Sequence, residues 1–210
     1  MAADSAVAFE PRKTPVQARA TVTVGAICEA TIQVLLSHGA ERLTTTRVAD
    51  RAGVSVRTLY QYYPNKRSLL FAVFEDHMNK VSQAVETACA DACHQAMSEM
   101  IRQVVEAFVD VKMQRADISV ALYKVAPDFG GAALVKQAGQ RLSKAIEAML
   151  LTAPDLKSPD RFAIDIMLSA MSGAMRSALE RGASPAMFRK VREHLVVLCQ
   201  TYMAATARNN

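Results

Sequence analysis

The chain has 210 residues, of which 25 are basic and 20 acidic, so its formal net charge is +5. Half of the residues (51%) are hydrophobic, yet the chain has no Trp and contains 8 Gly and 7 Pro. This composition favours an all-helical protein over a sheet protein, which would use more β-branched and aromatic residues in alternation. The modest charge excludes a histone-like protein and suits one that meets nucleic acid with a single face.

The first 16 residues predict a disordered arm, because Ala, Pro and charges occur there without a helical or strand period. Arg12 and Lys13 either form a basic arm that reaches the DNA minor groove or belong to a solvated tail. Asp4 and Glu10 interrupt any apolar run, so no secretory signal is expected. No run of 18 apolar residues is present, and no membrane-spanning helix is predicted. The four cysteines lie in helical patterns, which indicates reduced thiols in a cytoplasmic protein.

A helix-turn-helix is predicted within residues 42–70, after a first helix whose apolar residues recur with the helical period between 17 and 37. The threonine run 44–46 offers N-cap hydroxyls for a short helix. Gly53 supplies the positive φ of a tight turn, and Ser55 caps a second short helix that ends before Pro64. Asn65 is the N-cap candidate of the helix that follows. Two short helices joined in this way place the second one in the DNA major groove.

Charge and side-chain chemistry agree with this prediction. Between Gly39 and Arg67 the chain has six basic and two acidic residues, a local net of +4. The second short helix exposes one Arg, two Tyr, one Gln and two hydroxyls, which suit base edges and phosphates.

At these residues the sequence resembles the tetracycline-repressor (TetR) family of bacterial transcription regulators. The matching features are Gly39, the threonine run, Val48-Ala49, Ala52-Gly53-Val54-Ser55, the segment 58–63, and Asn65-Lys66 followed by Leu69-Leu70. This ordered series is far more specific than a lone glycine motif. Arg57 stands where the family often has a small residue, and Tyr63 stands where Phe is usual. We expect Arg57 to change which operator is read rather than whether DNA is bound.

DNA contacts are expected from both short helices and from the start of the next one. Arg57 and Tyr60 are predicted at base edges with Gln61 in support, and Arg57 as a phosphate clamp remains an alternative. The resemblance implies that phosphates are held by Thr45, Thr46, Ser55, Thr58, Tyr62 and Lys66.

The helical pattern and the resemblance together predict an all-α protein of about nine helices. Residues 17–66 form the helix-turn-helix DNA-binding domain, and 67–210 form a helical ligand-binding and dimerisation domain. A long helix that starts near Asn65 and runs past Ala88 links the two domains.

The last two helices, expected at 160–180 and 185–205, are apolar over more than one face and must each bury more than one side. They form either the core of the domain or a two-fold four-helix interface, where Gly173, Ala174 and Ala178 would allow close approach. The resemblance implies the interface, and a homodimer also suits a palindromic operator.

Methionine and aromatic side chains are spread through the second domain, where they either fill the core or line a pocket for a small apolar or amphipathic effector. The pocket candidates are Phe108, Tyr123, Met167 and Met171, with Asp165 and His94 as polar partners. Two function classes remain open. One is a ligand-responsive repressor of a palindromic DNA operator, and the other is a DNA-binding protein whose helical domain only dimerises or binds a protein partner.

Metal and enzyme chemistry find little support. Cys89, Cys93 and His94 form the only metal-like cluster, but this cluster lacks the Cys-x-x-Cys turn of a structural zinc site. The tripeptide 128–130 stands without the other kinase motifs, and no phosphate loop or nucleophile elbow is present. We therefore expect no metal, no cofactor and no enzymatic activity.

Overall fold

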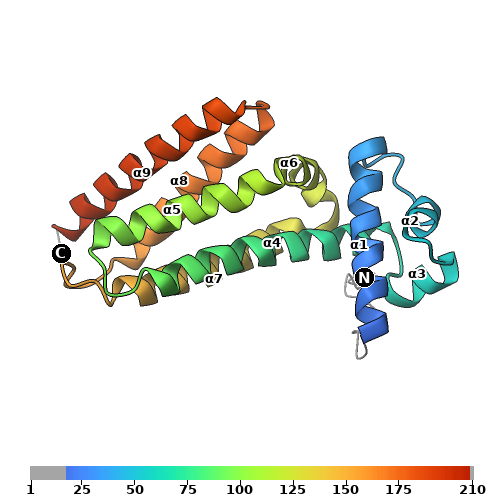
Figure 1. The fold of residues 1–210 in the computed structure, drawn as a ribbon, viewed down its shortest axis with the longest axis horizontal. Coiled ribbons are helices and arrows are strands. Elements are labelled where there is room, and N and C mark those ends of the chain that lie inside the picture. Colours follow the sequence, from blue (N-terminus) through green and yellow to red (C-terminus); the bar gives the residue numbers. More distant parts are fainter. Residues whose placement is uncertain (1–17, 209–210) are drawn as a thin grey trace, which may run out of the picture. The chain divides into compact units, whose positions relative to one another are not determined.

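A computed structural model describes the backbone of residues 18–208, which form nine α-helices, one 3₁₀ helix and no strand (Figure 1). The helices are α1 (Ala18–His38), α2 (Thr45–Ala52), α3 (Val56–Tyr62), α4 (Lys66–Asp91), α5 (Met97–Gln114), α6 (Ala116–Val125), η1 (Ala126–Phe129), α7 (Gly131–Leu150), α8 (Arg161–Glu180) and α9 (Pro185–Ala207). The prediction of an all-α protein with about nine helices is confirmed. The predicted arm at residues 1–16 lies outside the described residues.

The described residues form two compact units. The first unit comprises the described residues up to His77 together with Ala121–Leu134, and the second comprises Met78–Val120 and the described residues from Val135 onward. Helices α4 and α6 therefore contribute residues to both units. The predicted boundary after residue 66 separates a DNA-binding domain from a ligand-binding domain by function, whereas these two units are defined by packing. The predicted boundary therefore stays a prediction.

Helix α1 supplies the core of the first unit with Ile27, Val34 and Leu35, each at most 5% exposed. Thr31 is buried as well, and its hydroxyl donates to the carbonyl of Ile27 at 2.7 Å. By length and composition alone, the 20–38 part of α1 is apolar enough to cross a membrane, and α6 with α7 passes the same test as a bent pair. The sequence predicted no such segment. A third (33%) of this apolar window of α1 is buried inside the protomer.

The helix starts around the turn are set by local hydrogen bonds. The side chains of Thr44, Ser55 and Asn65 each accept from the backbone N–H three residues later, at 3.3, 3.0 and 2.9 Å. These bonds satisfy N–H groups that have no partner within the first turn of a helix. The predicted caps of α2, α3 and α4 are therefore present.

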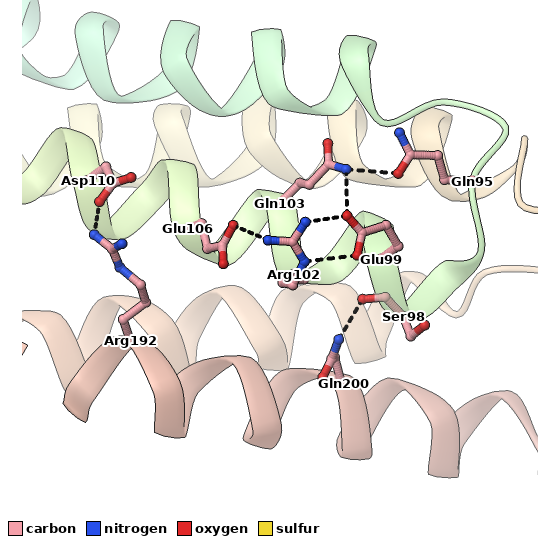
Figure 2. A network of polar contacts seen from close by, with 9 residues as sticks. All are labelled: Gln95, Ser98, Glu99, Arg102, Gln103, Glu106, Asp110, Arg192 and Gln200. Carbon is pink, nitrogen blue, oxygen red and sulfur yellow. Dashed lines mark hydrogen bonds and ion pairs between the residues drawn. The ribbon is translucent and has the colours of Figure 1, made fainter. Parts of the chain in front are cut away.

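In the second unit α5, α8 and α9 pack against one another (Figure 1). Figure 2 shows two polar links between α5 and α9. Arg192 pairs with Asp110, and the Gln200 amide donates to the carbonyl of Ser98 at 2.8 Å. These links fix the two helices at separate points along their length.

A second polar cluster lies along the exposed side of α5 (Figure 2). Arg102 donates to Glu99 at 2.8 Å and to Glu106 at 2.5 Å, and Gln103 donates to Glu99 at 2.9 Å. The hydrogen bonds from Arg102 and Gln103 lower the pKa of Glu99 to about 2. Ion pairs at this helical spacing on an exposed face add little to stability, so the cluster mainly orders these side chains.

Candidate nucleic-acid interface

The turn between α2 and α3 is made by Gly53, which has φ +66° and lies in the left-handed region that favours glycine. The next amide, of Val54, donates to the carbonyl of Ala49 at 3.0 Å and closes the end of α2. Val48, Ala49 and Leu59 are fully buried, so the two helices share one apolar seam. Because α3 buries Leu59, its opposite face points to solvent.

That opposite face carries the polar side chains of α3. Arg57 and Gln61 are exposed, and the side chain of neither makes a hydrogen bond or ion pair with the part of the chain that the structure describes. Tyr60 is 40% exposed. The face thus presents one guanidinium, one amide and one phenol with free donors or acceptors, which is the chemistry that reads base edges in a major groove.

The position of Tyr60 is fixed by the start of α2. Its hydroxyl lies 3.2 Å from the hydroxyl of Thr45, and either oxygen is able to donate. Ser55 and Thr58 are similarly paired, with their hydroxyl oxygens 2.8 Å apart. These contacts bring together four of the residues that were predicted to contact DNA. Each of the four hydroxyls is still able to form a further hydrogen bond.

The start of α4 is the third part of the surface. The ammonium of Lys66 donates to the carbonyl of Ala40, in the turn that follows α1, at 2.5 Å. An ammonium has three donors, so two remain for a phosphate. The N-terminal end of α4 adds the partial positive charge of the helix dipole. Thr46 is exposed on α2 and Tyr62 is half-buried at the end of α3.

The local net charge of +4 includes Arg47 and Arg51, but no DNA contact was predicted for either residue. Both are exposed on α2. One terminal guanidinium nitrogen of Arg47 donates to the carbonyl of Arg42 at 2.8 Å, and Nε of Arg51 donates to the side chain of Gln33 at 2.6 Å. Their remaining donors extend the basic surface around α2. The +4 charge of this stretch was the signal that could have identified them.

Tyr63, which stands where Phe was expected from the resemblance, is 2% exposed. Its hydroxyl lies 3.5 Å from the sulfur of Cys28 in α1. Burial raises the pKa of Tyr63 far above its ordinary value, so the phenol stays neutral. The hydroxyl is therefore a packing feature behind α3 and not a DNA contact.

The six predicted ligand residues differ in burial and in the compact unit to which they belong. Phe108 on α5 and Met167 and Met171 on α8 are at most 3% exposed in the second unit. Tyr123 belongs to the first unit, where its ring packs edge-on against Phe74 with centroids 6.1 Å apart. The two predicted polar partners face solvent. They are His94 and Asp165.

His94 occupies the turn between α4 and α5, with φ +66°. Its backbone N–H donates to the hydroxyl of Thr152 at 2.8 Å, so its role in the structure is to close this turn. A buried charge that the sequence analysis did not single out is Lys112, which is 2% exposed at the end of α5. Its helical spacing after Phe108 was the available signal.

Among the described residues no group of three His, Cys, Asp or Glu side chains could hold a metal ion. Burial raises the pKa of Cys89 to about 12, which keeps this thiol protonated near neutral pH. The sulfur of Cys93 donates to the carbonyl of Cys89 at 3.4 Å. This pair is accounted for by packing within α4 and the turn that follows it.

The fold and the surface on α2, α3 and α4 define a helix-turn-helix DNA-binding protein with a second, helical unit. Residues 27–73 match the model of bacterial regulatory proteins of the tetR family, and residues 96–203 match the tetracyclin repressor-like C-terminal domain. The chain belongs to the TetR family of bacterial transcriptional regulators. Proteins of this family bind DNA as regulators and are not enzymes.

Individual relatives agree with this assignment. An uncharacterized HTH-type transcriptional regulator of Mycobacterium tuberculosis is 33% identical over 63 residues, which is 30% of this chain and 33% of the relative. The chain thus aligns with about a third of the length of such curated relatives. A TetR-family regulator from Mesorhizobium loti has the same fold, with a TM-score of 0.75, 16% identity, and coverage of 90% of this chain and 98% of that one.

The TetR-like regulator LfrR from Mycobacterium smegmatis, solved in complex with proflavine, has a TM-score of 0.58 and 22% identity. The comparison covers 89% of this chain and 98% of LfrR. At these identities the two solved structures bear on the fold alone.

Proposed function

We propose that this protein is a transcriptional repressor that binds a palindromic DNA operator as a homodimer and is released by a small apolar or amphipathic ligand. The observation that carries the proposal is the exposed polar face of α3, where Arg57 and Gln61 have no partner among the described residues. DNA as the partner also favours a cytoplasmic location.

In this proposal Arg57 and Tyr60 contact base edges and Gln61 supports them. The hydrogen bond between the hydroxyls of Thr45 and Tyr60 holds Tyr60 in place before DNA arrives, which reduces the entropy lost on binding. Phosphates are held by the side chains around this face. These are Thr45, Thr46, Ser55, Thr58, Tyr62 and Lys66.

The outer faces of α8 and α9 support the proposed homodimer. Phe162 and Ile166 of α8 are 72% and 42% exposed, and Val197 and Leu198 of α9 are 62% and 51% exposed. Apolar side chains at this helical spacing are a surface that a second copy would cover, because a two-fold axis pairs each patch with itself. Gly173 is exposed on α8, and a Cβ added there would meet nothing within 4 Å in the protomer.

The position of Ala178 differs from the expectation that it lines an interface. Ala178 is 7% exposed within the protomer, so it belongs to the core of the second unit. Ala174 is half-buried. The close approach between copies therefore rests on Gly173 rather than on Ala178.

The proposed switch uses α4, whose 26 residues run through both compact units. A ligand that binds the second unit and shifts α4 would change the separation of the two α3 helices from the roughly 34–36 Å of one DNA turn. For ordinary coupling the ligand binds the released form more tightly by about 1–3 kcal/mol. Operator DNA must then weaken ligand binding by the same factor.

The test is selection of duplexes from a random library by the purified full-length protein, followed by affinity measurements on the selected site. We expect a palindrome whose affinity depends steeply on salt. Arg57→Ala should weaken binding to the selected site by about 1–3 kcal/mol and reduce the base preference at one position per half-site. Arg189→Ala, an exposed arginine on α9, is the matched control and should leave both properties unchanged. Unchanged base preference in Arg57→Ala would contradict the assigned role.

The alternative is a DNA-binding protein whose helical unit only dimerises or binds a protein partner. A compound library screened for release of the selected operator separates the two functions. Release by a small molecule, with reciprocal weakening of its affinity by operator, supports the repressor. A ligand whose affinity is the same with and without operator would refute the switch.

A further inference from the structure

The turn between α4 and α5 is held by a segment that lies far from it in the sequence. The backbone N–H of His94 donates to the hydroxyl of Thr152 at 2.8 Å, and the backbone N–H of Met97 donates to the carboxylate of Asp155 at 2.8 Å. Both acceptors belong to the loop of residues 151–160 between α7 and α8. Two hydrogen bonds from one loop therefore reach both sides of the turn.

The start of α5 has no cap of its own. Ala96 has the extended backbone of an N-cap residue, with φ −63° and ψ 144°, but its side chain makes no capping hydrogen bond with the first turn of α5. Asp155 supplies an acceptor from outside the helix, and its negative charge is favourable at the positive end of the helix dipole. The chain thus uses a distant carboxylate where a local Ser, Thr or Asp would ordinarily stand.

His94 adds backbone strain to the same turn. Its φ of +66° lies in the left-handed region, which no other residue except glycine adopts in the described part of the chain. Such a conformation persists only where the surrounding contacts hold it. The hydrogen bond from the N–H of His94 to Thr152 is a contact of this kind. Opening of the 151–160 loop would remove this contact and allow the turn to relax.

The 151–160 loop is itself fixed to the end of α7. The hydroxyl of Thr152 donates to the carbonyl of Met149 at 2.7 Å while it accepts from His94. The backbone N–H of Ala153 also donates to the last turn of α7, at 3.1 Å, and Ala153 is 7% exposed. Asp155 follows Thr152 after only two residues. Movement of one acceptor consequently moves the other.

We propose that the 151–160 loop is a strap that closes the α4–α5 turn through Thr152 and Asp155, and that the two contacts open together as one local unit. Local opening of this kind takes place below the free energy of global unfolding. Because the turn follows directly on α4, the strap also fixes the end of the helix that contributes to both compact units. Neither DNA nor a ligand takes part in these contacts, so failure of the proposed repressor function would leave the strap in place.

The test is amide hydrogen exchange of the full-length protein, followed residue by residue by NMR. Asp155→Ala removes the acceptor of the Met97 N–H, and loss of a capping acceptor corresponds to an exchange rate about twofold to thirtyfold higher. We expect the His94 amide to accelerate within the same range, although its own acceptor is intact. Thr152→Val should likewise accelerate the Met97 amide as well as the His94 amide. Valine has the shape of threonine, so this change reports the hydroxyl rather than packing.

Conservative variants separate the hydrogen bonds from the side chains that make them. Asp155→Asn and Thr152→Ser each keep an acceptor oxygen, so both amides should exchange within about twofold of their wild-type rates. Retained protection in these variants also shows that the turn folds normally when the acceptors are present. Faster exchange of both amides in Thr152→Ser would contradict the role of the hydroxyl and overturn the proposal.

Gln200→Ala is the matched control, because Gln200 of α9 donates to the carbonyl of Ser98, the residue after Met97, at 2.8 Å (Figure 2). This variant removes a contact to the same helical turn from a different element, and it should leave the His94 amide unchanged. His94 exchange as fast in Gln200→Ala as in Asp155→Ala would indicate general loosening of α5 and overturn the proposal. An Asp155→Ala protein in which Met97 alone accelerates would overturn it as well, because the two contacts would then be independent caps.

Discussion

The start of α7 provides a sharp test of packing in the first unit. A Cβ added to Gly131 would lie 2.8 Å from the Cβ of Ala126, 3.0 Å from the carbonyl oxygen of Ala126 and 3.0 Å from Cε1 of Phe74. Phe74 is fully buried and packs edge-on against Phe129, with centroids 5.7 Å apart, so it has little freedom to retreat. The methyl group of Gly131→Ala therefore enters occupied space.

The expected cost follows from two opposing effects. Overpacking of this kind costs about 1–3 kcal/mol. Replacing glycine by alanine in a helix returns at most about 1 kcal/mol, and less at the first residue of a helix. We expect Gly131→Ala to lower the free energy of unfolding by about 1–2 kcal/mol.

Gly139 in the same helix is the matched control, because a Cβ there meets nothing within 4 Å. Gly139→Ala should raise the free energy of unfolding by about 0.5–1 kcal/mol. Urea unfolding followed by far-UV circular dichroism, at one fixed protomer concentration, measures both changes. A Gly131→Ala protein as stable as Gly139→Ala would refute the packing argument around Phe74.

Three further predictions concern DNA binding, assembly and the thiols. Lys66→Ala should weaken binding to all DNA sequences alike and reduce the slope of log affinity against log salt by about one, and an unchanged slope would contradict its phosphate contact. Gly173→Glu should leave the protomer folded but give monomers in sedimentation equilibrium, and a dimer of wild-type affinity would exclude this face as the interface. Because burial raises the pKa of Cys89 to about 12 and of Cys199 to about 11, iodoacetamide near neutral pH should leave both unmodified in the native protein and modify them after unfolding. Mass spectrometry of the labelled peptides reads this out, and rapid native labelling of Cys89 would contradict its burial.

Local sequence was sufficient to predict the helices and the helix-turn-helix. Thr44, Ser55 and Asn65 cap helices as expected, and Gly53 adopts the positive φ of the predicted turn. Caps and turns depend on hydrogen bonds between residues three or four positions apart, and the apolar period of each helix lies within a single segment. These features need no knowledge of distant contacts, so the sequence by itself determined them together with the exposed chemistry of α3.

The tertiary structure decided which face of each helix is covered. Ala178 and Gly173 are both small residues of α8, yet the first is buried and the second exposed. Tyr123 packs with Phe74 in the first unit, and Lys112 is enclosed in the second. Helical periodicity places residues on a common face, but burial depends on the helices packed there, which are distant in sequence. For this reason the sequence predicted the exposed polar face of α3 closely and the interior of the second unit only in outline.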